Sequence, residues 1–384
     1  MPWTWDEIKR VWLRDVQITD PPAEVWVDHF NVVERYFGRD WLDHSRFKNG
    51  VETWGPEPAL YLVSQGARLA CLDGVPGADH LIERLRRRDD DAWAELTALW
   101  LLKSADLDVL IEVEPRVPGL SSVPDFRARR GSDVWTYVEV TQPNMSEEHQ
   151  RLNQILARLG GLLDAVPGRY ALEVFLRRAP STDELQFITR RIPDICRMDG
   201  LYVEELPQGL GTLYLNETAP GRVELRDHGE EYRPRLGRAN SRVGNGVAQR
   251  HIAIRLAFTD ERAEAFLDSE ARQLPKDAPG LIMIQTSGAT GAFKQWEPTL
   301  RRRLRPKLHT RVSGICLFQS GMVPTEKGEA WRPESRTLVN PNAPLQLPAW
   351  VVTNLGRFPP MDAEDLIATN PSSTQDSADI PQKV

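Results

Sequence analysis

Apolar residues recur with helical spacing over the first eighty residues. In residues 6–16 and 25–37 they lie three or four positions apart, which is the spacing that gives a helix one buried face. We therefore predict that residues 1–80 form a helical region of short helices joined by turns.

After residue 80 the pattern changes to an ordered succession of helical and β-branched segments. It predicts, in chain order, a helix over 91–103, strands over 107–117, 123–130 and 134–141, a helix over 147–163 that Asn144 or Ser146 can cap, and a strand over 170–176. This order is typical of a mixed α/β domain. The first strands should be antiparallel, and the crossover through the second helix should give a parallel pair.

The second half of the chain has weaker patterns. They predict a hairpin around Pro220-Gly221, a mainly helical segment over 250–274, and short apolar strands over 280–286 and 313–321. These elements could extend the same sheet.

Composition narrows the class of protein. With 384 residues, of which 41% are hydrophobic, the chain can bury one large core or two ordinary ones. No stretch approaches eighteen consecutive apolar residues, and the three cysteines lie too far apart for a zinc motif or a disulfide framework. We therefore expect a cytoplasmic protein with no membrane partner. Residues 361–384 are acidic and polar, so we expect a disordered tail there.

The charge pattern is compatible with local binding of nucleic acid. A net charge of −7 argues against a protein that coats nucleic acid with its whole surface, but not against a local basic groove. Arg127, Arg129 and Arg130 form one basic cluster for such a groove, and further arginine runs begin at Arg84 and Arg301. A solvated surface is the alternative for each run. The chain has no GxSxG elbow, no Walker loop and no HxH or HxxxH pair, so those catalytic classes are not indicated.

Two acidic residues, Asp125 and Glu139, are predicted to meet across a β-hairpin whose turn contains Gly131. A three-residue loop puts Asp125 opposite Glu139, whereas a two-residue loop puts Asp125 opposite Val138. In either register two like charges lie close together, so a cation must lie between them or one must take up a proton. A shared metal ion is the natural completion.

The second strand of this hairpin should have one apolar and one polar face. Because side chains alternate along a strand, Thr136, Val138 and Val140 form an apolar face that a helix would cover. Glu139 and Thr141 lie on the opposite face, which we expect to open into a cleft.

Glu95 interrupts an apolar helical stripe. Ala92, Ala98, Leu99 and Leu102 lie beside it at helical spacing, and a charged residue in such a stripe is rarely left unpaired. We predict that this helix brings Glu95 towards Asp125 and Glu139. The alternatives are a place at the edge of the stripe and a buried ion pair with an arginine.

The segments WAELTALWLL, VPDFRAR and YVEVTQP together resemble the PD-(D/E)XK superfamily, which has the restriction-endonuclease-like fold. In that superfamily a helix glutamate precedes a Pro-Asp pair at a strand end and an acid-x-lysine strand; Glu95, Asp125 and Glu139 lie at the matching positions here. The resemblance covers residues 91–180. It implies an α/β nuclease-like domain over 81–360, with a mixed sheet flanked by helices.

The resemblance also implies a reaction. Asp125 and Glu139 would bind Mg²⁺ or Mn²⁺ and activate a water that attacks a DNA phosphodiester, and Glu95 would complete or orient the metal shell. Thr141 stands at the superfamily's lysine position in this catalytic set, without the lysine's positive charge. Lys103, on the same helix as Glu95, is one candidate to replace that charge.

Three functions are open at this point. The first is a metal-dependent nuclease acting on DNA, in restriction or defence. The second is a nuclease-fold protein that has lost catalysis and serves as a binding or regulatory module, which Thr141 and the acidic balance favour. The third is a soluble interaction protein whose acids form ordinary surface ion pairs. The choice between DNA and RNA and the formation of a homodimer are also open.

A second segment, residues 269–286, loosely resembles part of some prokaryotic nuclease-like proteins. There, a helix ending in Gln-Leu precedes a Pro-Gly turn and an apolar strand, as Gln273-Leu274 and Pro279-Gly280 do here. An ordinary connection between a helix and a strand is the alternative.

Overall fold

The protein is described by a computed structural model. It describes residues 4–14, 23–44, 60–87, 89–104, 108–120, 122–143, 147–166, 170–198, 200–216, 218–219, 222–223, 235–244, 247–257, 262–286, 292–325 and 328–359. The expected disordered tail at 361–384 lies outside these residues, as do the expected helix caps Asn144 and Ser146.

The chain forms two compact units. Unit 1 comprises Met1–Pro143, Glu264–Gly288 and Leu300–Val384, and unit 2 comprises Asn144–Ala263 and Ala289–Thr299. These bounds differ from the expected division at residue 80. The N-terminal helices belong to the same unit as the predicted carboxylates, and unit 2 is inserted into the chain of unit 1.

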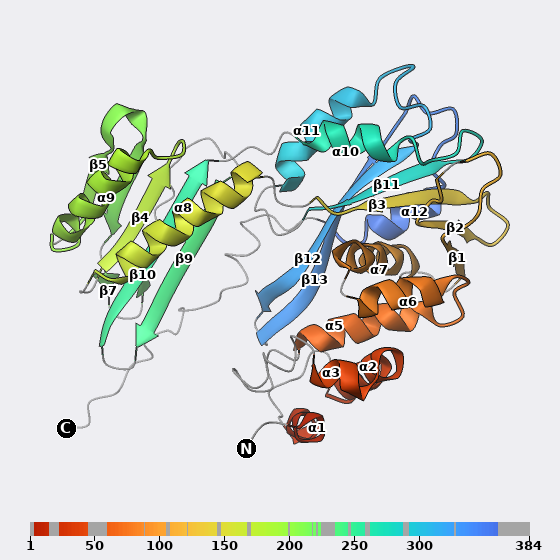
Figure 1. Ribbon diagram of the computed structural model, residues 1–384, viewed down its shortest axis with the longest axis horizontal. Helices are drawn as coiled ribbons and strands as arrows, with labels where there is room; N and C mark the ends of the chain where they lie inside the picture. The colour runs from red at the N-terminus through yellow and green to blue at the C-terminus, as the bar shows by residue number, and fades with distance from the viewer. Residues whose placement is uncertain are drawn as a thin grey trace, which may run out of the picture. The chain divides into compact units, whose positions relative to one another are not determined.

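Unit 1 is built on a six-stranded mixed sheet. Its strands, in spatial order, are β1 (Val109–Val113), β2 (Phe126–Arg130), β3 (Thr136–Thr141), β11 (Gly280–Gln285), β12 (Gly314–Thr325) and β13 (Gly328–Val339). β11 runs parallel to both β3 and β12, and the other neighbours are antiparallel. The predicted α/β class, with mixed sheets flanked by helices, is confirmed (Figure 1).

The expected parallel partner of β3 was wrong. The predicted helix and strand do form, as α8 (Glu147–Asp164) and β4 (Tyr170–Leu176). β4, however, joins the sheet of unit 2, and the strand parallel to β3 is β11. The crossover from β3 to β11 therefore carries most of unit 2, because parallel pairing constrains where the chain returns and not how many residues lie between.

Helices cover both faces of the unit 1 sheet. The helices of unit 1 are α1 (Trp5–Arg14), α2 (Ala23–Phe37), α3 (Arg39–Asp43), α5 (Leu60–Leu69), the 3₁₀ turn η2 (Ala70–Leu72), α6 (Ala78–Arg86), α7 (Asp90–Lys103), α10 (Ala263–Glu270) and α12 (Ala349–Leu355), and α11 (Ala292–Arg303) is divided between the two units at Leu300. The predicted helices over 6–16, 25–37 and 91–103 are α1, α2 and α7. In Figure 1, α10 lies on the opposite side of the sheet from α7.

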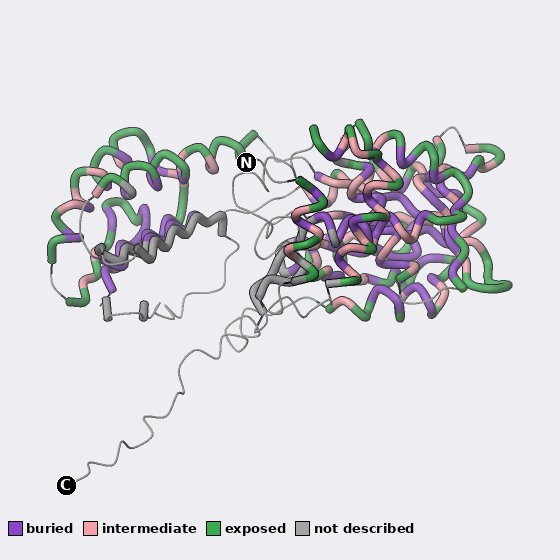
Figure 2. Tube along the Cα trace, turned by 90° about the horizontal axis from the view of Figure 1, so that it is seen from below, coloured by how far each residue is buried: buried purple, intermediate pink, exposed green. Residues whose placement is uncertain are grey.

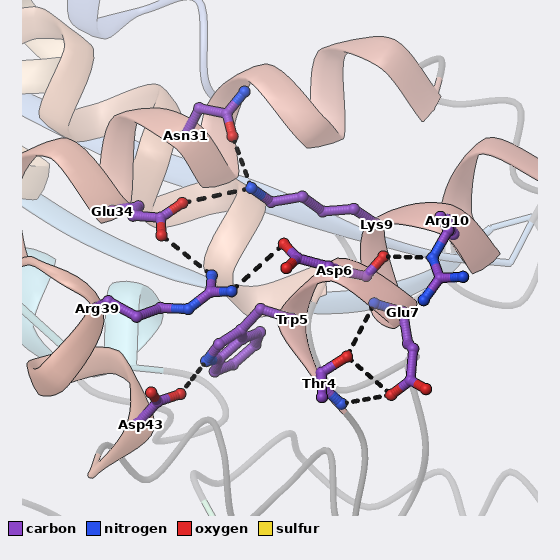
Figure 3. A network of polar contacts seen from close by, with 10 residues as sticks. All are labelled: Thr4, Trp5, Asp6, Glu7, Lys9, Arg10, Asn31, Glu34, Arg39 and Asp43. Carbon is purple, nitrogen blue, oxygen red and sulfur yellow. Dashed lines mark hydrogen bonds and ion pairs between the residues drawn. The ribbon is translucent and has the colours of Figure 1, made fainter.

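The N-terminal helices pack through aromatic residues and a polar network. Trp5 and Phe30 are buried, with ring centroids 5.1 Å apart. The indole of Trp5 donates a hydrogen bond to Asp43 (2.8 Å), and Lys9 donates to Asn31 (2.9 Å) (Figure 3). These contacts join α1 to α2 and α3. Figure 2 shows that buried residues fill the interior of unit 1.

Unit 2 has a five-stranded sheet. Its strands, in spatial order, are β5 (Tyr202–Glu205), β6 (Gly211–Asn216), β4, β10 (Val247–Ala257) and β9 (Arg235–Gly244). Leucines of α8 and isoleucines of α9 (Thr182–Ile195) share a core with this sheet, and a 3₁₀ turn, η3 (Pro207–Gly209), precedes β6. The two-residue strands β7 (Thr218–Ala219) and β8 (Arg222–Val223) flank Pro220-Gly221, where a hairpin was predicted.

The mainly helical prediction for residues 250–274 was wrong in its first part. Residues up to Ala257 belong to strand β10, and only α10 is helical. Ile252, Ile254 and Leu256 are buried with a period of two, which is the strand period. No helix in the described part of the chain has both the length and the apolar character needed to cross a membrane.

Candidate functional site

The β2–β3 hairpin has the register that a three-residue loop requires. Phe126 pairs with Val138 and Ala128 with Thr136, so continuation of the ladder places Asp125 opposite Glu139. A carboxylate oxygen of Asp125, Oδ2, accepts a hydrogen bond from the backbone N–H of Val140 at 2.6 Å. The first of the two predicted registers is therefore confirmed.

Asp125, which is half-buried, and Glu139, which is buried, form a carboxyl pair. Glu139 is 2% exposed, and the two side chains are hydrogen-bonded to each other. Burial, and then the charge of Asp125, raises the pKa of Glu139 to about 10, and burial raises the pKa of Asp125 to about 6. At neutral pH the pair therefore holds one proton, which Glu139 donates to the Asp125 carboxylate.

One oxygen of this pair has no protein partner. Glu139 Oε1 is buried and makes no hydrogen bond. A buried acceptor without a donor is costly, typically by about 1–3 kcal/mol. Glu139 Oε1 is therefore the oxygen of the pair that could accept a further donor or a cation.

The cleft expected in front of Glu139 stays a prediction, because the face of β3 that carries Glu139 is only partly covered. Val138 and Val140 pack with α7 in the main core, as expected. The opposite face is covered around Glu139, because Glu139 and its β11 neighbour Ile282 are both buried. α10 lies on this side of the sheet (Figure 1). Tyr137 and Thr141, which share the face of Glu139, are half-buried, whereas the sequence had indicated a covering helix on only the other side.

Glu95 is held by an arginine. It lies on α7, is 3% exposed, and accepts two hydrogen bonds from Arg84, one to each oxygen, at 2.6 and 2.9 Å. Arg84 also donates to Asp89, the N-cap of α7, at 2.9 Å. Burial, and then Asp125, raises the pKa of Glu95, and Arg84 opposes that rise. The alternative of a buried ion pair with an arginine is thus the arrangement found.

A fourth acid, Glu270, was missed by the sequence reasoning. It is the last residue of α10, and Gln273 donates a hydrogen bond to it at 2.6 Å. Burial raises its pKa, and its charge in turn raises the pKa values of Asp125 and Glu139. The segment 269–286 had drawn attention through Gln273 and Leu274, but nothing local marked the glutamate three residues earlier.

Lys103 does not take the place that Thr141 leaves. Thr141 is the half-buried last residue of β3, opposite Ile284 of β11. Lys103 donates to the backbone carbonyl of Cys71 at 2.9 Å, so its ammonium is engaged elsewhere. The cation that acts on Glu95 and Asp125 is Arg84.

Two of the three predicted nucleic-acid-binding arginines share the sheet face of Glu139. Arg127 pairs with Tyr137, which lies on that face. The guanidinium groups of Arg127 and Arg129 lie 4.4 and 4.5 Å from the ring centroid of Trp135. Arg130 alternates to the other face and is exposed.

The donor atoms of these side chains suit a hard divalent cation, whereas their placement suits it only in part. The acids supply only oxygen donors, which Mg²⁺ and Mn²⁺ prefer, and Glu139 Oε1 is unpartnered. As placed, however, no three His, Cys, Asp or Glu side chains of the described residues are arranged to hold a metal ion together. Asp125 and Glu139 are joined by a proton, and Glu95 is turned to Arg84.

No protein-family model matches the chain, and no curated protein is similar to it. An argument about function therefore rests on the carboxyl pair and its surroundings.

Proposed function

We propose that this chain is a Mg²⁺- or Mn²⁺-dependent phosphodiesterase that acts on DNA, with a restriction-endonuclease-like unit 1. The observation that carries the proposal is the Asp125–Glu139 carboxyl pair. Burying a carboxyl group beside a second one is expensive, and sequences rarely retain such an arrangement without a use for it. The order of α7, the antiparallel strands β1 to β3 and the parallel strand β11 is compatible with the proposed fold.

Asp125 and Glu139 are the residues that would hold the metal. A bound divalent cation supplies Lewis-acid stabilisation of a phosphodiester and lowers the pKa of a water molecule. The backbone N–H of Val140 fixes the Asp125 carboxylate, and the Arg84 pair fixes Glu95 beside it. Glu139 itself is buried, which strengthens charge interactions at its carboxyl group.

The arginines of β2 support a nucleic-acid substrate. Arg127 and Arg129 are held over Trp135 on the sheet face that carries Glu139. Guanidinium groups bind phosphate oxygens in a planar, two-pronged geometry, and such contacts position a backbone without reading its sequence. Arg127 is also ion-paired with Glu112, to which its Nε donates at 2.8 Å, so it would have to share or exchange that partner; we assign Arg129, and Arg127 on that condition, to the phosphate backbone of the substrate.

A plasmid-cleavage assay tests the proposal. The parent protein is incubated with supercoiled DNA and Mn²⁺ or Mg²⁺, and Glu139→Ala should lower the cleavage rate at least about 100-fold, since metal-based charge stabilisation amounts to several kcal/mol. Glu173→Gln is the matched control, because Glu173 is a buried glutamate of unit 2. Cleavage that survives in Glu139→Ala, or that stops equally in Glu173→Gln, contradicts the proposal.

A second function is favoured by specific observations. Thr141 brings no cation, Arg84 neutralises Glu95, and the remaining pair is satisfied by a proton. These features suit a nuclease fold that binds nucleic acid without cutting it. Binding of a labelled DNA duplex, weakened in Arg127→Ala, together with no cleavage in Mg²⁺ or Mn²⁺, would favour this second function.

A further inference from the structure

We infer that residues 305–311, which we call the basic loop, form a second surface that binds the phosphates of a DNA duplex, across the sheet from the arginines of β2. The inference rests on the proposed function for its partner, and it adds a docking surface that takes no part in the chemistry. The loop belongs to unit 1 and lies between α11 and β12.

The charge of this part of the chain has one sign. Residues 300–312 contain six arginine and lysine residues and no aspartate or glutamate, in a chain whose net charge is −7. Arg305 and Lys307 are exposed. Asp268 of α10 reaches the segment, but its carboxylate accepts hydrogen bonds from Arg303 at 2.9 and 3.0 Å. Asp268 therefore does not neutralise the two exposed cations of the loop.

The backbone of the basic loop is held in a fixed shape. Lys307 and His309 both have a left-handed backbone, with φ angles of 68° and 51°, which is costly for residues other than glycine and persists only where the surroundings impose it. His309 Nε2 lies 3.2 Å from Asp268 Oδ1. Arg311 donates to two backbone carbonyls of the segment that follows α10, at 3.1 and 3.2 Å. A backbone fixed in this way loses less conformational entropy on binding than a flexible one.

The segment that follows α10 adds two more cations beside the loop. Arg272 and Lys276 are exposed, and so is the acid Asp277. The backbone carbonyl of Arg272 is one of the two that hold Arg311, so this segment and the loop form one surface. With the two exposed cations of the loop, the surface carries four exposed positive charges against one exposed acid.

This surface lies near the arginines of β2. The backbone carbonyl of Arg311 packs so closely on Gly280 that a Cβ there would overlap it. Gly280 pairs with Tyr137, and Tyr137 pairs with Arg127, so the four residues share one side of the sheet. Two strand spacings, about 10 Å, separate Gly280 from Arg127. One duplex, whose major groove is about 12 Å wide, can therefore place phosphates at both clusters.

The surroundings of the loop favour a nucleic acid over an anionic membrane. A segment that binds a membrane surface usually does so through an amphipathic helix with an apolar face turned to the lipid. The basic loop consists of turns and bends and contains one leucine, Leu308. The neighbouring Leu300 and Leu304 are buried in the protein. The loop thus offers a lipid surface charge but little apolar area.

Fluorescence anisotropy of a labelled DNA duplex in EDTA, over a range of KCl concentrations, measures docking without metal or cleavage. Arg305→Gln with Lys307→Gln should weaken binding at least about tenfold at about 0.1 M salt and lower the slope of log affinity against log salt by about 2 in magnitude, because two phosphate contacts are lost. The loss should be equal for duplexes of unrelated sequence, since phosphate contacts do not read bases.

The matched control is Arg151→Gln with Arg158→Gln. It removes the same charge from two exposed arginines of α8 in unit 2, and it should bind like the parent. Circular dichroism checks that each variant is folded. If the double variant of the loop does not fold, Arg272→Gln tests the same surface, because Arg272 holds Arg311 through its backbone and not its side chain.

The outcomes separate the inference from the proposed function. A parent-like salt slope in the loop variant, with binding weakened in Arg129→Gln, overturns the role of the loop alone. An equal loss in the α8 control also overturns it, because net charge would then explain the effect. Loss of binding to phosphatidylserine vesicles in the loop variant, with parent-like DNA binding, would assign the loop to a membrane instead. A parent that binds no duplex overturns the inference and the proposed DNA substrate together, whereas loop-dependent docking without cleavage supports the inference and contradicts only the proposed catalysis.

Discussion

Replacing Glu139 by glutamine should make the metal-free protein more stable at alkaline pH. Its folded-state pKa of about 10 lies far above the ordinary value of 4.5. Such a group contributes stability that is fully present below pH 4.5 and is lost as the pH rises towards 10. A glutamine can donate the same hydrogen bond to Asp125 and does not titrate, so Glu139→Gln should remove this loss.

The size of the effect follows from the linkage slope. Between the two pKa values the parent protein loses about 1.4 kcal/mol of unfolding free energy per pH unit because of Glu139. From pH 6.5 to 8.5, above the pKa of about 6 for Asp125, the advantage of the variant over the parent should therefore grow by about 3 kcal/mol. The slope depends only on the pKa of Glu139 lying above this range.

Urea unfolding followed by tryptophan fluorescence, in EDTA, measures this difference. Every tryptophan except Trp296 belongs to unit 1, so the signal reports mainly the unit that contains Glu139, and the Trp296→Phe background removes the contribution of unit 2. Other titrating groups are common to both proteins and cancel in the comparison. If the gap between variant and parent stays constant from pH 6.5 to 8.5, Glu139 does not hold a proton and the account of the pair is wrong.

Other perturbations have equally definite outcomes. Arg84→Met should lower the free energy of unfolding in urea by about 3–5 kcal/mol, because it leaves Glu95 buried without its partner. The double variant Arg84→Met with Glu95→Leu should recover most of that loss. A loss below about 1 kcal/mol in the single variant would contradict the ion-pair assignment. Gly66→Ala should lower the unfolding free energy by about 3 kcal/mol, since a Cβ there would overlap a backbone carbonyl of α2. Gly161→Ala should instead raise the unfolding free energy by about 1 kcal/mol, because its Cβ meets open space on α8. Equal effects at both sites would refute the close α2–α5 crossing. Mn²⁺ binding should release about one proton at pH 8, and its affinity should rise about tenfold for each unit by which the pH rises. Calorimetry in buffers of different ionisation enthalpy measures the proton release. Binding without proton release would contradict the shared proton.

The carboxyl pair could be predicted from local signals in the sequence. The turn at Gly131 and the alternation along residues 134–141 were enough to predict that Asp125 lies opposite Glu139, because strand pairing across a short turn depends on nearby residues. The interruption of an apolar helix by Glu95 likewise drew attention to this residue, and a buried ion pair with an arginine was one of the alternatives that it left open. In these cases the residues that decide the structure lie within a few positions of those they place.

Long-range features could not be predicted in the same way. β3 pairs with β11 after more than a hundred intervening residues, and nothing in the sequence of either strand indicates that the other is its partner. Arg84 was one arginine in a run of several, and its pairing with Glu95 depends on how α6 packs against α7. Glu270 has no local motif, since its position is set by the packing of α10 on the side of the sheet that was expected to be open. For Ile252 and Ile254 a strand period was present in the sequence, and the helical prediction overlooked it.

The central claim, that Asp125 and Glu139 exchange their shared proton for a divalent cation, is tested most directly by crystallography in Mn²⁺. An anomalous difference map should contain a manganese peak within about 2.0–2.6 Å of oxygens from both residues, and the peak should be absent from Glu139→Gln crystals grown in the same solution. A parent structure at pH 8 in which the two carboxyl groups stay hydrogen-bonded to each other, with no peak beside them, would contradict the account.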